Sequence, residues 1–140
     1  MREDDKDISS WPTGRLLSVA ARLVEARFHD VLAEYRLTHA GMIALHHLTS
    51  SPLTQRELAR LSRVTDQTIS KTIEHLRKVG YVSKDTDARD RRRALITISD
   101  TGRTALESVR KQERQSERLL GAVDDYDAFR RQLIKLITHT

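Results

Sequence analysis

Short hydrogen-bonding side chains are concentrated between residues 65 and 71 of the 140-residue chain. The side-chain amide of Gln67 has the geometry that pairs with adenine in the major groove of DNA, and Lys71 can donate to guanine or to a phosphate. Hydroxyl groups in the same stretch can bond phosphates or base edges. The predicted DNA contacts of this stretch are Thr65, Gln67, Thr68, Ser70 and Lys71. Asp66 is left out, because phosphates would repel its carboxylate.

An arginine run follows, with aspartates beside it. The run comprises Arg89, Arg91, Arg92 and Arg93, and the aspartates are Asp87 and Asp90. An arginine at the tip of a hairpin can enter a narrow minor groove, where the negative potential is enhanced, while neighbouring carboxylates hold the guanidinium groups. We predict DNA contacts for Arg89, Arg91 and Arg92. A solvated loop with internal ion pairs is the alternative, and we expect it to apply to one or two of the four arginines.

The excess of positive charge lies in the middle of the chain. Residues 56–93 contain 11 Lys and Arg and 6 Asp and Glu, whereas the rest of the chain contains 14 of each. A basic patch on a neutral scaffold is typical of a surface that binds a polyanion. A solvated helix face would give the same count, so charge alone does not decide between the two.

Hydrophobic periodicity predicts two helices before the polar cluster. Apolar residues recur at three- and four-residue steps from Thr13 to about Tyr35. Thr38 can cap a second helix that continues to about Leu48, and Pro52 prevents its extension. Both helices are amphipathic, so each is expected to bury one face.

The polar cluster falls on the second helix of a closely spaced pair. Thr54 and Glu57 form a capping-box pattern that begins the first helix of the pair, and residues 62–64 break it. Thr65 can cap the second helix, and Gly80 can end it. The inward stripe of this second helix consists of Ile69, Ile73 and Leu76.

Two strands and two further helices are predicted after Gly80. Residues 81–84 and 94–98 have the composition of β-strands and enclose the arginine run, so they predict a hairpin with a long charged tip. Ser99 can cap a helix over about 101–121. Asp124 or Asp125 can cap a final helix with an apolar side of Phe129, Leu133, Leu136 and Ile137.

This order of elements predicts a mainly α fold of the α+β type. Two short helices separated by a three-residue break and followed by a two-strand hairpin form a winged helix-turn-helix. In this arrangement the second helix enters the major groove and the hairpin is the wing. The polar cluster and the arginine run are thereby predicted to belong to one surface.

Several classes of function lack the residues they need. The chain has no cysteine, which excludes disulfides, thiolate zinc sites and cysteine-based redox sensing. It contains no G-x-S-x-G, phosphate-binding glycine loop or H-E-x-x-H, so we predict no enzyme, cofactor or metal site. No apolar run approaches the roughly 20 residues that cross a bilayer, and residues 1–7 are too acidic for a signal peptide. We therefore expect a cytoplasmic protein without a membrane partner.

Three segments resemble the MarR family of winged-helix transcription regulators. Thr54-Gln55-Arg56-Glu57-Leu58-Ala59 is similar to the family's helix-turn-helix entry, Asp87-Ala88-Arg89-Asp90-Arg91-Arg92 to its D-x-R-D-x-R wing, and Ile98-Ser99-Asp100-Thr101-Gly102-Arg103 to its L-T-x-x-G exit. The wing is the most specific of these matches. One departure lies in the turn of the helix pair, where the family usually has glycine and this chain has Ser62.

The resemblance implies a homodimer and a division of the chain. Residues 1–140 would form one domain, in which 1–36 and 100–140 supply the dimerisation helices and 38–99 form the winged lobe. Two lobes would straddle a pseudo-palindromic operator in double-stranded DNA, with half-sites about one helical turn apart. The expected role is that of a repressor.

The resemblance also implies a small aromatic or phenolic effector, bound between the dimerisation helices and the lobe. Residues with suitable side chains are Trp11, Arg15, His39, Met42 and His46. Trp11 could stack on a ring and Arg15 could pair with a carboxylate, while the other three complete the wall. Each has a structural alternative: Trp11 as a packing anchor, Arg15 in a dimer ion pair, and the histidines as hydrogen-bonded structural residues.

A winged helix that binds RNA or another protein is the competing interpretation. Such a module would keep the fold without needing a two-fold dimer, a palindrome or ligand control. The oligomeric state and the dependence of duplex binding on salt and sequence distinguish the two.

Overall fold

The computed structural model describes residues 7–115 and 120–139. Its elements are α2 (Thr13–Glu34), α3 (His39–Leu48), β1 (Leu53–Thr54), α4 (Gln55–Ser62), α5 (Asp66–Lys78), β2 (Val82–Thr86), β3 (Ala94–Ile98), α6 (Asp100–Gln115) and α7 (Tyr126–His139). The mainly α fold with a two-strand wing is therefore confirmed.

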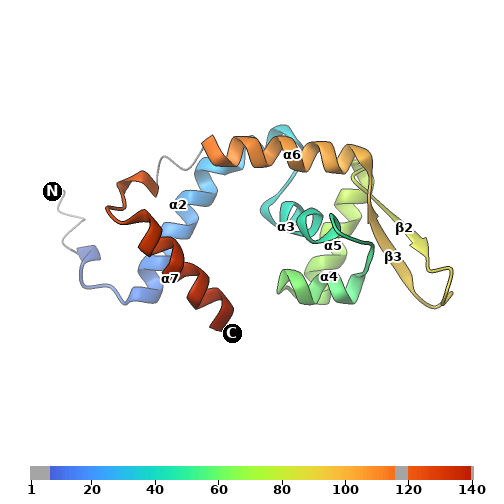
Figure 1. Cartoon of the computed structure of the whole chain (residues 1–140), viewed down its shortest axis with the longest axis horizontal. Coiled ribbons are helices and arrows are strands. Elements are labelled where there is room, and N and C mark those ends of the chain that lie inside the picture. Colours follow the sequence, from blue (N-terminus) through green and yellow to red (C-terminus); the bar gives the residue numbers. More distant parts are fainter. Residues whose placement is uncertain (1–6, 116–119, 140) are drawn as a thin grey trace.

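The elements form a lobe and an arm (Figure 1). The lobe contains α3, α4, α5 and the projecting β2–β3 hairpin, whereas α7 and the start of α2 lie on the other side of the molecule. Helix α6 runs above the lobe toward the arm. The far end of α2 reaches the lobe, where Phe28 and Leu32 are buried in its core.

The hydrophobic core lies in the lobe. Its largest fully buried side chains are Leu32, Leu45, Leu48, Leu58, Ile69, Leu76, Ile96, Leu106 and Val109. They come from α2, α3, α4, α5, β3 and α6, because each of these helices carries an apolar stripe and β3 turns alternate residues inward. The predicted inward stripe of α5 is confirmed, since Ile69, Ile73 and Leu76 are all buried.

Hydroxyl and carboxylate caps start the helices where the sequence predicts. The Oγ1 atoms of Thr38, Thr54 and Thr65 accept from the backbone N–H groups three residues later at 3.0, 3.1 and 3.1 Å. Ser99 Oγ accepts from Gly102 N at 3.0 Å and Asp125 Oδ1 from Ala128 N at 3.0 Å. Each cap satisfies a backbone donor that the first helical turn leaves without an intrahelical partner.

The sheet has three strands, one more than the sequence predicts. β2 and β3 pair antiparallel from Val82↔Ile98 to Thr86↔Ala94, and β1 pairs with β3 through Leu53↔Ile96. The strand order is β1-β3-β2. A two-residue strand cannot show an alternating pattern, so β1 leaves no signal of its own in the sequence.

Three local predictions need correction. β2 extends to Thr86 rather than ending near residue 84, because its exposed polar residues keep pairing with β3. The helix after Ser99 begins at Asp100 and is described to Gln115, and the predicted continuation to 121 includes residues outside the described part. The left-handed residue in the turn of the helix pair is Arg63, with φ of 57°, whereas Ser62 is still helical.

Gly102 explains why the exit segment carries glycine. The first turn of α6 packs against the backbone of Tyr81, and a Cβ atom at Gly102 would overlap the Tyr81 carbonyl oxygen. Ser99 N also donates to that oxygen at 2.9 Å. The absence of a side chain at Gly102 therefore lets α6 begin directly beside Tyr81, the residue before β2.

Candidate nucleic-acid interface

The polar face of α5 is built by the burial of its other face. With Ile69, Ile73 and Leu76 in the core, the predicted contacts all lie on the exposed side. These are Thr65, Gln67, Thr68, Ser70 and Lys71. Thr65 is already engaged, because its hydroxyl caps Thr68 N and donates to Thr68 Oγ1 at 3.0 Å. The other four side chains present hydrogen-bonding groups to solvent along the first half of the helix.

The wing tip is shaped by its two aspartates. Asp87 Oδ1 accepts from the backbone N–H of Arg89 at 2.9 Å, and Asp90 Oδ1 accepts from that of Arg92 at 3.0 Å. The two carboxylates therefore mainly accept hydrogen bonds from the backbone of the wing loop and so shape its turns. The sequence predicts instead that they hold guanidinium groups. One such contact exists, between Arg92 Nε and Asp90 Oδ1 at 3.7 Å, but the Arg92 side chain is still 95% exposed.

The four arginines of the run divide into two kinds. Arg93 Nη2 donates to Glu57 Oε1 at 2.8 Å and Arg92 pairs with Asp90, so internal ion pairs occupy two of the four. Among the ion pairs of the described residues, none involves Arg89 or Arg91. These two therefore carry the positive charge of the wing that is least neutralised by the protein itself.

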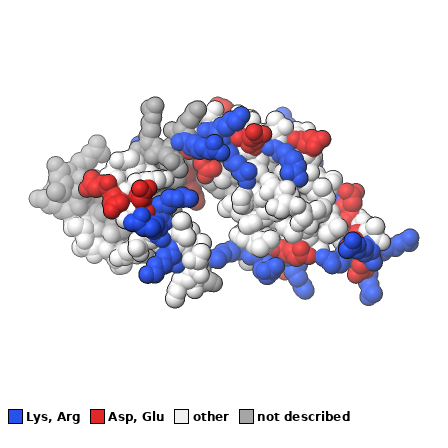
Figure 2. Space-filling model, viewed as in Figure 1, with Lys and Arg blue, Asp and Glu red and all other residues white. Residues whose placement is uncertain are grey.

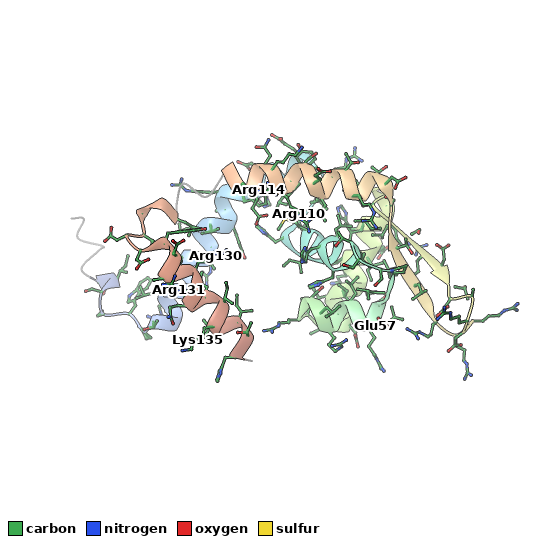
Figure 3. The ribbon with its side chains drawn as sticks, in the orientation of Figure 1. Glu57, Arg110, Arg114, Arg130, Arg131 and Lys135 are labelled. Atoms are coloured by element: carbon green, nitrogen blue, oxygen red, sulfur yellow. The ribbon has the colours of Figure 1, made fainter. Side chains whose placement is uncertain are left out.

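The Arg93–Glu57 pair joins the wing loop, just before β3, to the start of α4. The sequence pattern predicts a capping-box role for Glu57, but its carboxylate accepts from Arg93, a residue 36 positions away. Glu57 lies at the end of α4 that faces the wing (Figure 3). Together with the β1–β3 pairing, this contact fixes the direction in which the wing leaves the lobe.

Basic side chains line the edge of the lobe formed by α4, α5 and the wing. Lys and Arg atoms gather along this lower edge and at the wing in Figure 2. A hollow of about 560 Å³ between the start of α4 and the wing adds Arg56 and Lys84, which the sequence analysis did not select. α5 packs against β2 and α4 against β3, so the helix pair and the hairpin form one surface.

The predicted effector residues lie in three places in one protomer. Arg15 lies over the ring of Trp11, with its guanidinium carbon 5.5 Å from the ring centroid. His39 stands beside Phe28, with ring centroids 6.1 Å apart, and its Nε2 lies 3.4 Å from the Glu25 carbonyl oxygen. Met42 and His46 line a hollow of about 320 Å³ between α3 and α6.

The hollow beside Met42 and His46 is also lined by a basic side chain that the sequence did not indicate. Its other lining residues are Ile43, Leu106, Arg110 and Glu113, and Arg110 Nη2 donates to His46 Nδ1. Arg110 lies 64 positions after His46, so no local pattern could have indicated this contact. The neighbouring His47 has its pKa lowered below the ordinary value of 6.5, first by burial and then by repulsion from His46.

A comparison with known families finds a match within the lobe. Residues 37–93 match the MarR family. This stretch begins just before α3 and ends just before β3. The winged-helix lobe of this chain is therefore similar to the MarR family. The matched stretch includes all of α5 and the D-x-R-D-x-R segment at 87–92, so the most specific motif lies within it.

Similar proteins extend the likeness beyond the MarR stretch. The HTH-type transcriptional regulator YwaE of Bacillus subtilis is 33% identical over 57% of this chain and 47% of its own length. The transcriptional repressor CouR, solved with a 23-mer DNA duplex, is 25% identical with a TM-score of 0.79, covering 90% of this chain and 92% of CouR. A Mycobacterium tuberculosis MarR family protein in complex with p-aminosalicylic acid is 25% identical with a TM-score of 0.72, covering 90% of this chain and 98% of its own. The chain spans 47% and 64% of the two curated relatives it matches.

Two features are absent from the residues that the structure describes, a metal-ligand group and a membrane-spanning helix. Within residues 7–115 and 120–139, no three His, Asp or Glu side chains are grouped as metal ligands. None of the helices in these ranges has the length and apolar character to cross a bilayer.

Proposed function

We propose that this chain is a sequence-specific double-stranded DNA-binding transcription regulator that acts in the cytoplasm as a homodimer. It binds a pseudo-palindromic operator, represses transcription, and is released by a small aromatic acid. The observation that carries the proposal is the exposed polar half of α5 beside the arginine-bearing wing. The match of residues 37–93 to the MarR family and the DNA-bound state of CouR support it.

In this proposal α5 and the wing have different roles. Gln67, Ser70 and Lys71 on α5 read base edges in the major groove, while Thr65 and Thr68 contact phosphates. Arg89, Arg91 and Arg92 approach the minor groove and its phosphates. Gln67→Ala is then expected to relax base preference at one position of each half-site, and Arg91→Ala to weaken binding evenly and reduce the salt slope.

The homodimer is supported by apolar surface on the arm. Large apolar side chains of the arm are exposed in one protomer: Ile8, Leu17, Leu23, Val24, Ile134, Leu136 and Ile137. Helix α7 has no buried residue, although its apolar side chains recur along one side. A second copy of the same arm would cover this surface and set two lobes against successive turns of the duplex.

The effector is proposed to bind in the hollow lined by Met42 and His46. Arg110 would pair with the acid group and the apolar side chains would contact the ring. The p-aminosalicylic acid complex of the Mycobacterium tuberculosis relative supports an aromatic acid. Trp11, Arg15 and His39 remain predicted ligand residues, and equal salicylate affinity in Arg15→Ala and the unmodified protein would remove Arg15 from the site.

Selection of duplexes from a random pool, followed by binding measurements at several salt concentrations, tests the proposal. The expected result is a palindromic preference, a dimer in solution and a steep loss of affinity with salt. A monomer with equal affinity for all duplexes would contradict it and favour the RNA-binding or protein-interaction module.

A further inference from the structure

A carboxylate at the start of α5 has no partner within the described part of the protein. Asp66 is the first residue of this helix, and its side chain is exposed. In residues 7–115 and 120–139, none of the ion pairs within 4.0 Å and none of the side-chain hydrogen bonds involves its carboxylate. Both oxygens of Asp66 therefore keep their capacity to accept hydrogen bonds from a ligand.

Capping of α5 does not use the Asp66 side chain. An acidic residue at a helix start often accepts from the backbone N–H groups of the first turn. In α5 this acceptor is Thr65 Oγ1, which lies 3.1 Å from Thr68 N. The Asp66 charge still interacts favourably with the helix dipole, but this interaction leaves its oxygens open to a further donor.

The second carboxylate of α5 is in a different situation. Glu74 Oε1 lies 3.7 Å from Lys78 Nζ, four residues further along the helix. This is an ordinary solvent-exposed pair, with 74% of the lysine and 70% of the glutamate side chain accessible. The charge of Glu74 is therefore offset within the helix, whereas the charge of Asp66 is not.

The C-terminal half of α5 is held by the rest of the lobe. His75 Nε2 donates to the Arg36 carbonyl oxygen at 2.9 Å, and Tyr81 N donates to the Leu76 carbonyl oxygen at 2.9 Å. These contacts attach this end of α5 to the turn after α2 and to the residue before β2. In a helix-turn-helix the N-terminal residues of the second helix contact the base edges. Asp66 is therefore at the end of α5 that faces the base pairs in the proposed complex.

A carboxylate in this place discriminates among the bases, because it can only accept hydrogen bonds. In the major groove guanine presents two acceptors, and thymine presents one acceptor and a methyl group. Adenine has an acceptor nitrogen directly beside its amino donor, whereas cytosine presents its N4 amino group alone. Phosphates repel the carboxylate. Cytosine is therefore the base that complements Asp66.

We propose that Asp66 is a specificity-determining residue, whose carboxylate accepts a hydrogen bond from the N4 amino group of a cytosine in each half-site. This inference rests on the proposed DNA-binding function and sharpens it, because it assigns a base pair to the first turn of α5. At any other base the carboxylate would lose its water to acceptor atoms or phosphates. Asp66 therefore rejects other sequences as well as selecting cytosine.

Selection of duplexes from a random pool by the full chain and by two variants tests the inference. The unmodified protein should prefer cytosine about tenfold over the other bases at one position of each half-site. Asp66→Asn introduces an amide of nearly the same shape, which pairs with adenine, so the preference at that position should change from cytosine to adenine. Asp66→Ala should lose the preference there and bind random duplex at least about threefold tighter, because a repelling charge is gone.

Glu74→Gln is the matched control. It removes the same charge from the exposed side of α5, but from a residue that already has a lysine partner. It should leave every base preference unchanged, so that any effect of net charge alone is measured separately. Thermal unfolding should show that both Asp66 variants remain folded, because the side chain is exposed and the Thr65 cap is retained.

The outcomes separate this inference from the proposed function. A selected half-site without cytosine, or a cytosine preference that survives in both Asp66 variants, would overturn the inference and leave sequence-specific DNA binding intact. A uniform gain in affinity with unchanged preferences would also overturn it, because Asp66 would then act only as a repelling charge. If the unmodified protein selects no sequence at all, the proposed function fails and the base-reading role of Asp66 fails with it.

Discussion

The lobe and the arm of this protomer differ in how completely they bury their apolar side chains. The core residues lie between Phe28 and Val109, in the lobe and the part of α2 that reaches it. The arm carries most of the exposed large apolar side chains, and α7 buries none of its residues. Both regions have amphipathic helices. The apolar stripes of the lobe are covered by other elements of the same chain, whereas those of the arm stay largely exposed.

This difference shows that amphipathic periodicity predicts which face of a helix is buried, but not which surface covers that face. In the lobe, α5 finds β2 and α4 nearby in the same chain. In the arm, the apolar side of α7 is exposed in one chain and would be covered by the proposed second copy. Stability of the lobe and assembly of the arm should therefore respond to different substitutions.

The largest expected effect is on assembly through α7. Leu136→Asp/Ile137→Asp places two charges on its exposed apolar side, which would be buried at the proposed dimer interface. We expect a monomer by analytical ultracentrifugation and a loss of at least about 100-fold in operator affinity, because two linked half-sites become one. Gln132→Asp, an exposed polar position on the same helix, is the control. A double variant that stays dimeric would remove α7 from the interface.

The next effect is on the stability of the lobe. Leu58 on α4 is fully buried, and Leu58→Ala should lower the free energy of unfolding by about 3 kcal/mol, measured by urea denaturation. Leu23 on α2 is 55% exposed, so Leu23→Ala in the monomeric double variant should cost less than about 0.5 kcal/mol. Equal costs for the two substitutions would contradict the division between lobe and arm.

A smaller effect is expected where α6 meets the wing. Gly102→Ala puts a methyl group against the Tyr81 carbonyl oxygen, and the required backbone shift should cost about 2 kcal/mol of unfolding free energy. Gly14→Ala in the arm is the matched control, because nothing lies within 4 Å of its Cβ position. Helix propensity should make Gly14→Ala neutral or slightly stabilising. Equal thermal midpoints for both variants would refute the close approach.

The smallest effect concerns the pH dependence of the lobe. Burial, aided by His46, lowers the pKa of His47 below its ordinary value of 6.5. The folded state then takes up this proton less readily than the unfolded chain, so stability is highest above pH 6.5 and falls as pH decreases below it. His47→Gln should give a shallower fall in urea midpoint between neutral pH and pH 5. Parallel curves for the two proteins would argue against this shift.

Local chemistry made much of the fold predictable. The threonine caps at 38, 54 and 65 accept from nearby backbone groups, and the stripe of α5 follows from its spacing. Such features depend on residues three or four positions apart, which a sequence displays directly. The exposed side of α5, with its predicted DNA contacts, followed from the same spacing.

Contacts between distant residues were not predictable in this way. Glu57 has a local capping role in the sequence pattern, yet its carboxylate meets Arg93, which is brought there by the β1–β3 pairing. Arg110 reaches His46 only because α6 packs along α3. The effector set from the sequence thus included Met42 and His46 but lacked Arg110, and Trp11, Arg15 and His39 lie outside the lining of that hollow.

The short β1 strand has a mechanical consequence. Thr54 is both its last residue and the cap of α4, so the pairing of β1 with Leu95 and Ile96 joins the middle of β3 directly to the helix pair. A displacement of the wing is therefore transmitted directly to α4, because β1 and α4 are joined without a linker. The wing and the helix pair are therefore expected to turn as one rigid unit when the lobe meets a duplex.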